Sequence, residues 1–274
     1  MWSFAGCATV DGGAGGMGLS VSRRAVFAQL RFDAKVDVPA GLLLATTGAT
    51  LVALRPMLAT RPCQFSCTPL EVNALDAQVR QARWSDPTAA RTVGDVVGYG
   101  AVPAFALAAS LIGVAEGQST AEAMEDFWII GEAFALSHVL ESTLKYTTAR
   151  ARPDTTYAAP GAAVTDASDL YTSMVSGHAT ASFAVAVATG VVATMRKRPG
   201  APWVWLAGLT IATASSYLRI AADRHYLTDV LAGAALGSAM GVAVPLIFHG
   251  RSAPVTFAPQ VSSTGGGLAV SGRF

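Results

Sequence analysis

Three long stretches without a charged side chain constrain the fold of this chain most. Residues 96–115 and 230–248 contain no Asp, Glu, Lys, Arg or His, and residues 173–195 contain His178 alone among these types. A helix needs about 20 apolar residues to cross a hydrocarbon core about 30 Å thick. Each of the three stretches therefore predicts a membrane-spanning helix.

Three weaker candidates bring the predicted number of spans to six. They lie at residues 39–59, 127–144 and 203–218, and Glu132 and Glu141 in the second are predicted to face the protein interior because charges are costly in lipid. Ala, Gly, Ser, Thr and Val dominate all six, and such small residues let helices approach closely. We find no internal repeat and no strand pattern long enough for a sheet. The predicted fold class is all-α, a six-transmembrane helix bundle.

Composition supports a membrane protein and excludes several other classes. Hydrophobic residues make up 52% and charged residues 14% of the chain, against a usual charged share of about 25%. This balance excludes a disordered chain and disfavours an ordinary cytosolic enzyme. The net charge of +1 provides no basic excess for binding nucleic acid. Three cysteines cannot build a disulfide framework or a four-thiolate zinc site.

The chain is predicted to divide into three parts. Residues 1–38 are an N-terminal tail, residues 39–249 form the membrane domain, and residues 250–274 are a flexible, glycine-rich C-terminal tail. Cys63 and Cys67 lie between the first two spans. They can pair only if that loop faces an oxidising compartment, so a disulfide between them stays open.

A basic segment closes the third predicted span. Lys145 and Arg152 are seven residues apart, so in a helix they share a face, and Pro153 is expected to stop that helix. An ammonium group and a planar guanidinium both suit phosphate oxygens. A basic cluster at a helix end is also common as a membrane-interface anchor, so this segment alone leaves both interpretations open.

A short polar tripeptide opens the fourth predicted span. Ser176 is a favoured N-cap, Gly177 admits a ligand close to the backbone, and the free N–H groups of a helix start attract anions. His178 is expected in the first turn of this helix. The alternative is an ordinary helix start with a histidine that faces water.

The third polar segment leads into the sixth predicted span. Arg219 precedes His225 and Asp229, which are four residues apart and share a face if they are helical. A carboxylate there can accept the ring N–H and leave the other nitrogen free as a nucleophile or base. The alternative is a surface His–Asp pair that caps a helix. His138 and His249 receive no role, and His138 is expected to be hydrogen-bonded between helices.

The three segments, taken together and in this order, resemble the three-part signature of the type 2 phosphatidic acid phosphatase (PAP2) superfamily, which also contains the vanadium haloperoxidases. The resemblance covers residues 145–229. Val175 stands where the family usually has Pro, and Leu218 stands where it usually has Ser. Neither position carries the chemistry, although the missing Ser hydroxyl removes one phosphate contact.

The resemblance implies a role for each matching residue. His225 attacks phosphorus and forms a phosphohistidine, with Asp229 orienting the ring and stabilising its positive charge. His178 protonates the leaving oxygen and then activates water. Five groups are implied to hold the phosphoryl oxygens: Lys145, Arg152, Arg219, Ser176 and the N–H of Gly177. The family chemistry requires no metal, and the sequence contains no other convincing ligand cluster, so we predict no cofactor.

The implied substrate is a lipid phosphate in a membrane. Candidates are a polyprenyl diphosphate, a phosphatidyl phosphate or a lipid A-type glycolipid, and the resemblance does not choose among them or between a phosphomonoester and a diphosphate. The sequence predicts no nucleic-acid partner and leaves the oligomeric state open.

Counting spans places all three polar segments at one membrane face, because the third and fifth spans end where the fourth and sixth begin. Basic residues divide almost evenly between the two sides of the membrane, so the positive-inside rule gives almost no preference for either orientation. The cluster Arg196, Lys197 and Arg198 and the resemblance to bacterial lipid phosphatases favour a bacterial inner membrane with the site facing the periplasm.

Three other functions remain open from the sequence. A vanadate-dependent haloperoxidase would hold vanadate in the same cradle with His225 as its ligand. A soluble acid phosphatase of the superfamily is disfavoured by the long uncharged stretches. A non-catalytic lipid-binding or transport protein would be expected to lose His225, His178 or Asp229, and the chain keeps all three.

Overall fold

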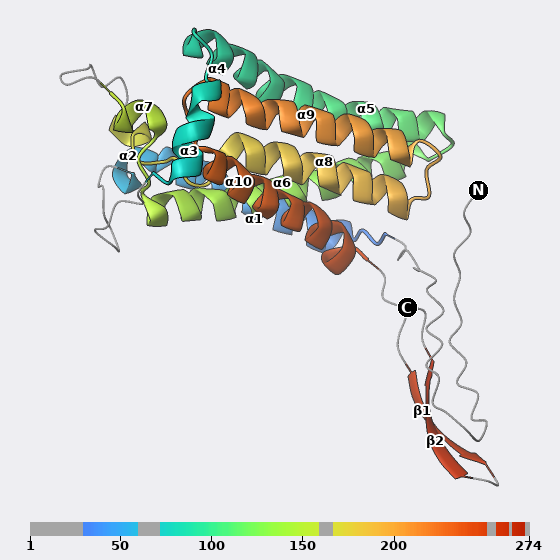
Figure 1. Ribbon diagram of the computed structural model, residues 1–274. Helices are drawn as coiled ribbons and strands as arrows, with labels where there is room; N and C mark the ends of the chain where they lie inside the picture. The colour runs from blue at the N-terminus through green and yellow to red at the C-terminus, as the bar shows by residue number, and fades with distance from the viewer. Residues whose placement is uncertain (1–29, 60–71, 159–166, 251–255, 263–264, 272–274) are drawn as a thin grey trace.

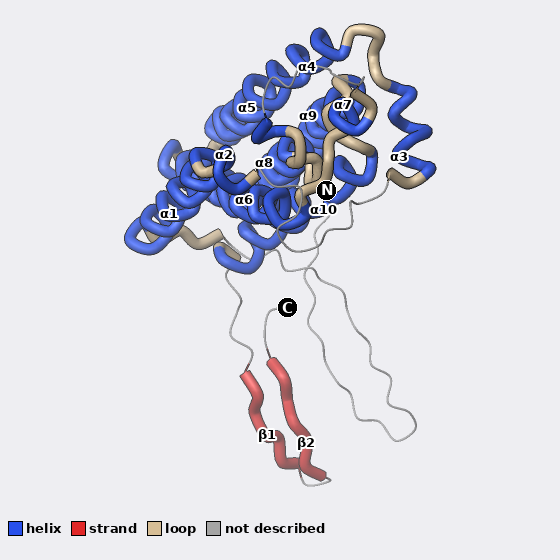
Figure 2. The backbone as a smooth tube through the Cα atoms, turned by 90° about the vertical axis from the view of Figure 1, so that its left-hand side faces the viewer, coloured by secondary structure: helices blue, strands red, loops and turns tan. Residues whose placement is uncertain are grey.

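The computed structural model describes residues 30–59, 72–158, 167–250, 256–262 and 265–271. In these ranges, long helices run side by side in a bundle and a two-stranded hairpin lies outside it (Figures 1 and 2). The long helices are α1 (Ala34–Ala53), α5 (Val102–Ala115), α6 (Thr120–Thr148), α8 (Gly177–Met195), α9 (Ala201–Ala221) and α10 (Leu227–Ala243). The shorter elements are α2 (Arg55–Leu58), α3 (Ala74–Val79), η1 (Arg80–Ala82), α4 (Pro87–Val96), η2 (Val97–Ala101), α7 (Pro153–Thr156), η3 (Ala167–Asp169) and η4 (Val244–Phe248).

The helical bundle and the membrane character predicted from the sequence are confirmed. Among the described residues, five helical segments are long and apolar enough to cross a membrane: Ala34–Ala53, Pro87–Ala115, Gly177–Met195, Ala201–Ala221 and Leu227–Phe248. The remaining predicted span lies in α6, whose 29 residues are long enough but more strongly charged. The count of six therefore stays a prediction.

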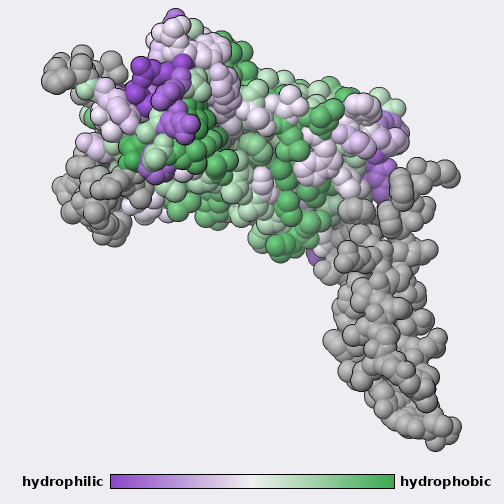
Figure 3. Space-filling view, viewed as in Figure 1, coloured by the Kyte–Doolittle hydropathy of each residue, from purple (hydrophilic) through white to green (hydrophobic). Residues whose placement is uncertain are grey.

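Helix α8 forms the centre of the bundle. It packs against α6, α9 and α10, and most of its residues are buried. The other long helices surround it and leave many large apolar side chains exposed. Figure 3 shows this apolar surface along the length of the bundle, with the most polar side chains gathered at its ends. An exposed apolar girdle of this kind is suited to lipid.

Three glycines of α10 explain how closely α8 and α10 approach. A Cβ on Gly237 would lie 2.2 Å from the carbonyl oxygen of Thr180, and one on Gly233 would lie 2.6 Å from that of Ser176. Gly241 meets α8 in the same way one turn further on. This small-residue stripe packs the two backbones together and fixes the start of α8 beside the start of α10.

The segment that the sequence analysis assigned to a flexible C-terminal tail contains two short strands. Strands β1 (Thr256–Ser262) and β2 (Gly265–Ser271) pair in antiparallel register, with Thr256 opposite Ser271 and Ser262 opposite Gly265. They are two residues apart in the sequence, the spacing of a tight hairpin. Neither strand shows a strict alternation of apolar and polar residues, because β1 contains Pro259 and β2 begins with three glycines, so periodicity did not reveal them.

Candidate active site

The three polar segments meet at one end of the bundle, on the left of Figure 1. Lys145 lies in the last turn of α6 and Arg219 in the last turn of α9. Ser176 is the N-cap of α8, with Gly177 and His178 in its first turn. At this same end, Arg152 precedes α7, His225 precedes α10, and Asp229 lies in the first turn of α10.

His225 is buried, with 5% of its surface exposed. Its Nδ1 lies 2.7 Å from the carbonyl oxygen of Ser173, and its Nε2 lies 2.9 Å from Nη1 of Arg152. A carbonyl can only accept and a guanidinium can only donate. The ring is therefore the neutral tautomer that carries its proton on Nδ1. Burial, followed by the charge of Arg152, lowers the pKa of His225 to about 3, in agreement with this assignment.

The predicted direct pairing of Asp229 with His225 needs correction. Helix α10 begins at Leu227, so His225 lies outside the helix, and its Nδ1 is 3.8 Å from Oδ2 of Asp229. Asp229 instead accepts the Ser173 hydroxyl at 2.6 Å and the Tyr226 N–H at 2.9 Å. Because Ser173 also accepts the His225 proton, Asp229 orients the imidazole mainly through Ser173.

The helical argument that placed Lys145 beside Arg152 was also wrong. Helix α6 ends at Thr148, where Ala149 takes a left-handed conformation with φ of 44°. Pro153 does not stop this helix but begins α7. Lys145 and Arg152 still line the same cavity, because the chain turns back on itself rather than because they share a helix face.

Each of the three cations predicted to hold phosphate is paired with a carboxylate. Lys145 Nζ lies 2.8 Å from Glu141, Arg152 Nη2 lies 2.9 Å from Asp169, and Arg219 Nη1 lies 2.9 Å from Asp95. The sequence analysis missed these partners. The spacing of Glu141 and Lys145, one helical turn apart, was a usable signal. Asp95 and Asp169 come from other segments, and no sequence signal points to them.

His178 lies beside the same carboxylate that binds Arg219. Its Nε2 is 3.2 Å from Oδ1 of Asp95, and its ring meets the Tyr99 ring edge-on at 4.8 Å. The helix of Asp95 approaches closely because two residues there lack a side chain. A Cβ on Gly94 would lie 1.7 Å from Arg219, and one on Gly98 would lie 2.5 Å from His178. Asp95 is thus placed between the two groups.

A cavity of about 520 Å³, here called the headgroup cavity, opens at this end of the bundle. Lys145, Arg152, Gly177 and His178 line its polar part. A Cβ on Gly177 would lie 2.8 Å from Lys145 Nζ, so any larger residue would push the Lys145 ammonium group away from this position. Behind this lining lie three buried residues: Ser176, Arg219 and His225. Within the described residues, the Ser176 hydroxyl has no hydrogen-bond partner.

The comparisons with known proteins agree with the family resemblance. The model of the PAP2 superfamily matches residues 126–253. The chain is similar to a transmembrane PAP2-type phosphatidylglycerolphosphate phosphatase of known crystal structure from Bacillus subtilis, with 20% identity, a TM-score of 0.44, and coverage of 72% of this chain and 94% of that one. No curated protein matches the chain.

The apolar helices support a multi-pass membrane protein, and part of that protein matches the PAP2 superfamily. The match begins within α6. Asp95 on α4 and the α5 wall of the headgroup cavity therefore come from outside the matched domain.

A second contribution from outside the matched residues holds Asp229 in place. Asp76 on α3 is fully buried and accepts Nη2 of Arg150 at 2.8 Å, and Arg150 in turn donates to Asp229. Asp76 also accepts the Thr228 N–H at 2.9 Å at the start of α10. The sequence analysis missed this network, which fixes the carboxylate of Asp229 in its ionised, fully bonded form.

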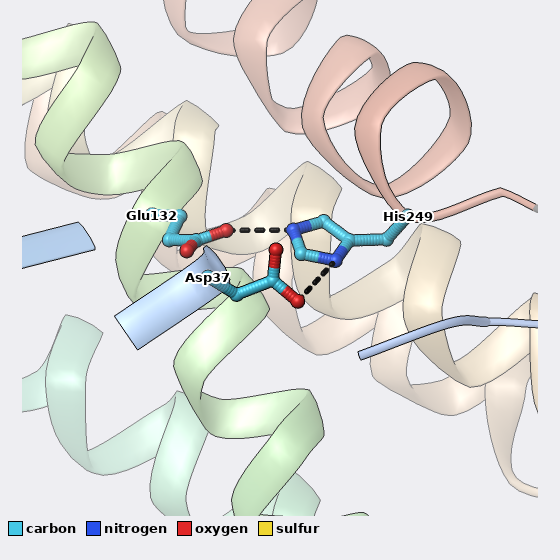
Figure 4. A group of neighbouring side chains, drawn as sticks. All are labelled: Asp37, Glu132 and His249. Carbon is cyan, nitrogen blue, oxygen red and sulfur yellow. Dashed lines mark hydrogen bonds and ion pairs between the residues drawn. The ribbon is translucent and has the colours of Figure 1, made fainter. Parts of the chain in front are cut away.

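Another group of ionisable side chains, in which Glu132 and His249 are buried, lies where the helical segment Leu227–Phe248 ends. Figure 4 shows Glu132 of α6, Asp37 of α1 and His249 pointing toward one another. The sequence analysis found no such cluster. Nε2 of His249 lies 2.6 Å from Glu132, and its Nδ1 lies 3.0 Å from the carbonyl oxygen of Arg31. Both ring nitrogens are engaged with protein groups, so the cluster ties the end of η4 to α6 and the N-terminal segment.

Proposed function

We propose that this protein is an integral-membrane lipid phosphatase that acts through a phosphohistidine. The observation that carries the proposal is the shape of the headgroup cavity. Its polar end contains Lys145, Arg152 and His178, and the same cavity continues along apolar side chains of α5, α6 and α8: Val102, Ala106, Ile130, Phe134 and Val185. A phosphate in the polar end would leave a hydrocarbon tail in the apolar part.

His225 is suited to the role of nucleophile because it is neutral. The lone pair of Nε2 attacks phosphorus and forms a P–N bond, while the P–O bond to the lipid breaks and His178 gives a proton to the leaving oxygen. Nη1 of Arg152 lies 2.9 Å from Nε2 and occupies its lone pair. Attack therefore requires the guanidinium to move from Nε2 onto the phosphoryl oxygens.

Water completes the reaction. His178 takes a proton from a water molecule, the water oxygen bonds to phosphorus, and the P–N bond breaks with its electron pair returning to His225. Phosphate leaves, and both imidazoles are restored. Lys145, Arg152, Arg219, Ser176 and the Gly177 N–H stabilise the charge that develops on the phosphoryl oxygens, which is the larger part of catalysis in phosphoryl transfer.

Substrate binding competes with the carboxylates that now hold the cations. A phosphate with two negative charges replaces Asp95 at Arg219, Asp169 at Arg152 and Glu141 at Lys145. No step in this scheme requires a metal. We therefore expect a chelator such as EDTA to leave phosphate release unchanged.

We further propose that the site faces the periplasm of a bacterial inner membrane. The turn after α8 with Arg196, Lys197 and Arg198 would then lie in the cytoplasm, as the positive-inside rule favours. Arg196 and Arg198 both pair with Asp126 of α6. The positive-inside rule counts Lys and Arg residues and gives little weight to acidic ones, so these pairs do not change the assignment. Labelling of Cys63 and Cys67, which lie outside the described residues, in intact cells tests the sidedness.

The direct test uses purified protein in detergent and a panel of lipid phosphates: a polyprenyl diphosphate, a phosphatidate and a lipid A-type phosphate. We expect the wild type to release phosphate from at least one of them and His225→Ala to lose nearly all of that activity. Equal release by the two proteins would remove His225 from the mechanism. Release from none would contradict the proposed function and favour a non-catalytic lipid-binding role.

A further inference from the structure

Asp95 is a carboxylate that two groups of the active site share. Its Oδ1 lies 2.9 Å from Nη1 of Arg219 and 3.2 Å from Nε2 of His178. The proposed reaction takes Arg219 away from Asp95, because the phosphoryl oxygens bind that guanidinium. His178 keeps its contact with the carboxylate. One acidic side chain therefore connects phosphate binding to the group that protonates the leaving oxygen.

The helix that carries Asp95 lies directly against the site. Helix α4 packs against α9 (Figure 1), and its glycine and that of η2, one turn apart, lie against Arg219 and His178 with no room for a Cβ. The chain is π-helical in η2, and π-helical turns often occur at functional sites. All of this lies outside residues 126–253, which match the PAP2 superfamily. The shared carboxylate is thus an addition to the three polar segments predicted from the sequence.

Nε2 of His178 has no hydrogen-bond partner among the described residues, although the side chain is only 14% exposed. Its contact with Asp95 therefore has the distance of an ion pair without the alignment of a hydrogen bond. Because a carboxylate can only accept, the nitrogen that faces it carries a ring proton. A proton on an unbonded nitrogen can pass to a leaving oxygen without first breaking a hydrogen bond.

The cations around His178 make a neighbouring carboxylate necessary. Arg219 shares Asp95 with His178, and Lys145 lines the same polar part of the headgroup cavity. A positive charge close to an imidazole disfavours its protonated form, whereas a negative charge favours it. Tyr99 meets the ring edge-on and brings no negative charge while its hydroxyl is protonated. Without Asp95, His178 would be surrounded by cations and a neutral ring and would be a poor acid.

Glu141 does not take this role, because it is bound elsewhere. Its Oε2 lies 2.8 Å from Nζ of Lys145, and its Oε1 lies 3.2 Å from Nδ1 of His138. His138 lines the headgroup cavity and pairs within its own helix rather than joining two helices, contrary to the sequence expectation. Among the described residues, Asp95 is thus the carboxylate that contacts His178.

We propose that Asp95 is a positioning residue for the general acid: phosphate binding releases it from Arg219, and its charge then holds the proton on His178. This inference rests on the proposed function and deepens it. The imidazolium gives its Nε2 proton to the leaving oxygen, and the neutral ring regains a proton from the attacking water. Asp95 itself neither gives nor takes a proton, so the proton balance of the reaction is unchanged.

The test compares two leaving groups. The alcohol of dioleoyl phosphatidate must receive a proton as it leaves, whereas the phenolate of p-nitrophenyl phosphate leaves without one. The readout is the ratio of kcat/KM for the lipid to kcat/KM for the aryl phosphate, both measured on one sample in mixed detergent micelles. This ratio does not depend on the folded fraction. A change in phosphate affinity at Arg219 affects both substrates alike and cancels.

We expect Asp95→Asn to lower this ratio about tenfold on the alkaline side of the pH profile, since an opposite charge within about 4–6 Å shifts a titration by about one pH unit or more. The alkaline limb of the lipid profile should move to lower pH by about one unit for the same reason. Asp95→Glu keeps the charge and should restore most of the ratio. The matched control is Glu125→Gln, which removes a similarly exposed partner of Arg196 near the start of α6 and should match the wild type.

A double variant distinguishes this role from a purely structural one. Because Asp95 acts through His178, Asp95→Asn should not lower the ratio further in a His178→Ala background. An unchanged ratio in Asp95→Asn alone, or a second fall of similar size in the His178→Ala background, would overturn the assignment. Failure of the proposed function looks different: the wild type would then release phosphate from neither substrate.

Discussion

Two buried histidines bracket the same helical segment and differ in what faces their ring nitrogens. His225 precedes Leu227–Phe248 and His249 follows it, so about 33 Å of helix separates them. His225 has a carbonyl at Nδ1 and the Arg152 guanidinium at Nε2. His249 has a carbonyl at Nδ1 and the Glu132 carboxylate at Nε2.

The neighbours determine the protonation states. An arginine can only donate, so Nε2 of His225 must offer a lone pair, whereas a carboxylate and a carbonyl both accept, so His249 donates from both nitrogens. Burial lowers the pKa of His225, and Arg152 adds to this effect. Burial also opposes charge on His249 and is the largest single effect, but the hydrogen bonds to Glu132 and to the Arg31 carbonyl, together with the charges of Glu132 and Asp37, outweigh it and raise the pKa. Burial alone therefore does not fix the charge of a histidine; the groups that face its two ring nitrogens do.

Removing each histidine in turn tests whether the two differ in their contribution to activity. We expect His225→Ala to lower phosphate release at least about 10³-fold, since loss of a nucleophile removes the covalent route. His249→Ala should retain the wild-type rate per folded molecule, because its ring lies at the other end of the bundle. Initial rates normalised to the folded fraction measure both. Comparable losses in the two variants would contradict the distinction.

The effect of removing His178 on the rate of phosphate release should depend on the leaving group. We expect His178→Ala to lose about 10²–10⁴-fold with a lipid phosphate, the range for a general acid–base group. With an activated phenyl phosphate that needs no proton, the first step should recover. Samples denatured at alkaline pH, where the P–N bond is stable, should then contain an accumulated phosphohistidine, since removal of the phosphoryl group still lacks its base. Absence of phosphorylated protein would argue against the covalent mechanism.

At the opposite end, the expected loss is in stability. His249→Ala leaves Glu132 buried without its charged partner, and breaking a buried pair costs about 3–5 kcal/mol. We expect a clear fall in the denaturant midpoint measured by circular dichroism in detergent. Lys197→Ala serves as the control, because Lys197 is an exposed residue in the turn after α8. Equal midpoints for the two variants would show that the His249 contact contributes little.

The two histidines should also give opposite pH dependence of stability. His225 stays neutral down to about pH 3 when folded but takes up a proton near pH 6.5 when unfolded. Its contribution is complete above that pH and is lost as the pH falls from about 6.5 to 3. His249 has a raised pKa, so its contribution is present below about pH 6.5 and is lost as the pH rises through the folded value.

Unfolding midpoints of two variants across this pH range measure the effect. His225→Gln should flatten the acid limb and His249→Gln the alkaline limb. Identical pH profiles for the two variants would contradict the assigned protonation states.

The smallest expected effect concerns Asp95, whose side chain is 39% exposed. Vanadate should inhibit the enzyme by mimicking the transferred phosphoryl group. An ion pair of this exposure is worth about 0.2–1 kcal/mol, so removing the competing charge in Asp95→Asn should lower the Ki for vanadate about two- to fivefold. Glu125→Gln, which removes a similarly exposed partner of Arg196 at the other end, should leave Ki unchanged. A weaker inhibition of Asp95→Asn would instead show that Asp95 assists anion binding.

Sequence reasoning predicted the helices and the three polar segments because both signals are local. Apolar stretches of about 20 residues reveal spans whatever their neighbours are, and the span count alone placed Lys145, His178 and His225 at one face. Sequence reasoning failed where helical spacing was applied to residues that lie beyond the end of a helix. Lys145 and Arg152 do not share a helix, and His225 is not on α10. Chain turns at helix ends, rather than helical periodicity, place these side chains.

The residues themselves, their order and their membrane setting were therefore determined by the sequence. The tertiary structure decided what each residue touches. Arg152 faces Nε2 of His225 across 73 positions, and Asp95 meets Arg219 across 124. Such contacts depend on how helices pack, and the packing depends on glycines such as Gly94 and Gly233 whose role is visible only when the opposing backbone or side chain is in place. The periodicity of a sequence does not tell which distant carboxylate or cation will lie beside a given histidine. Those neighbours set the charge of each histidine, so only the tertiary structure could decide it.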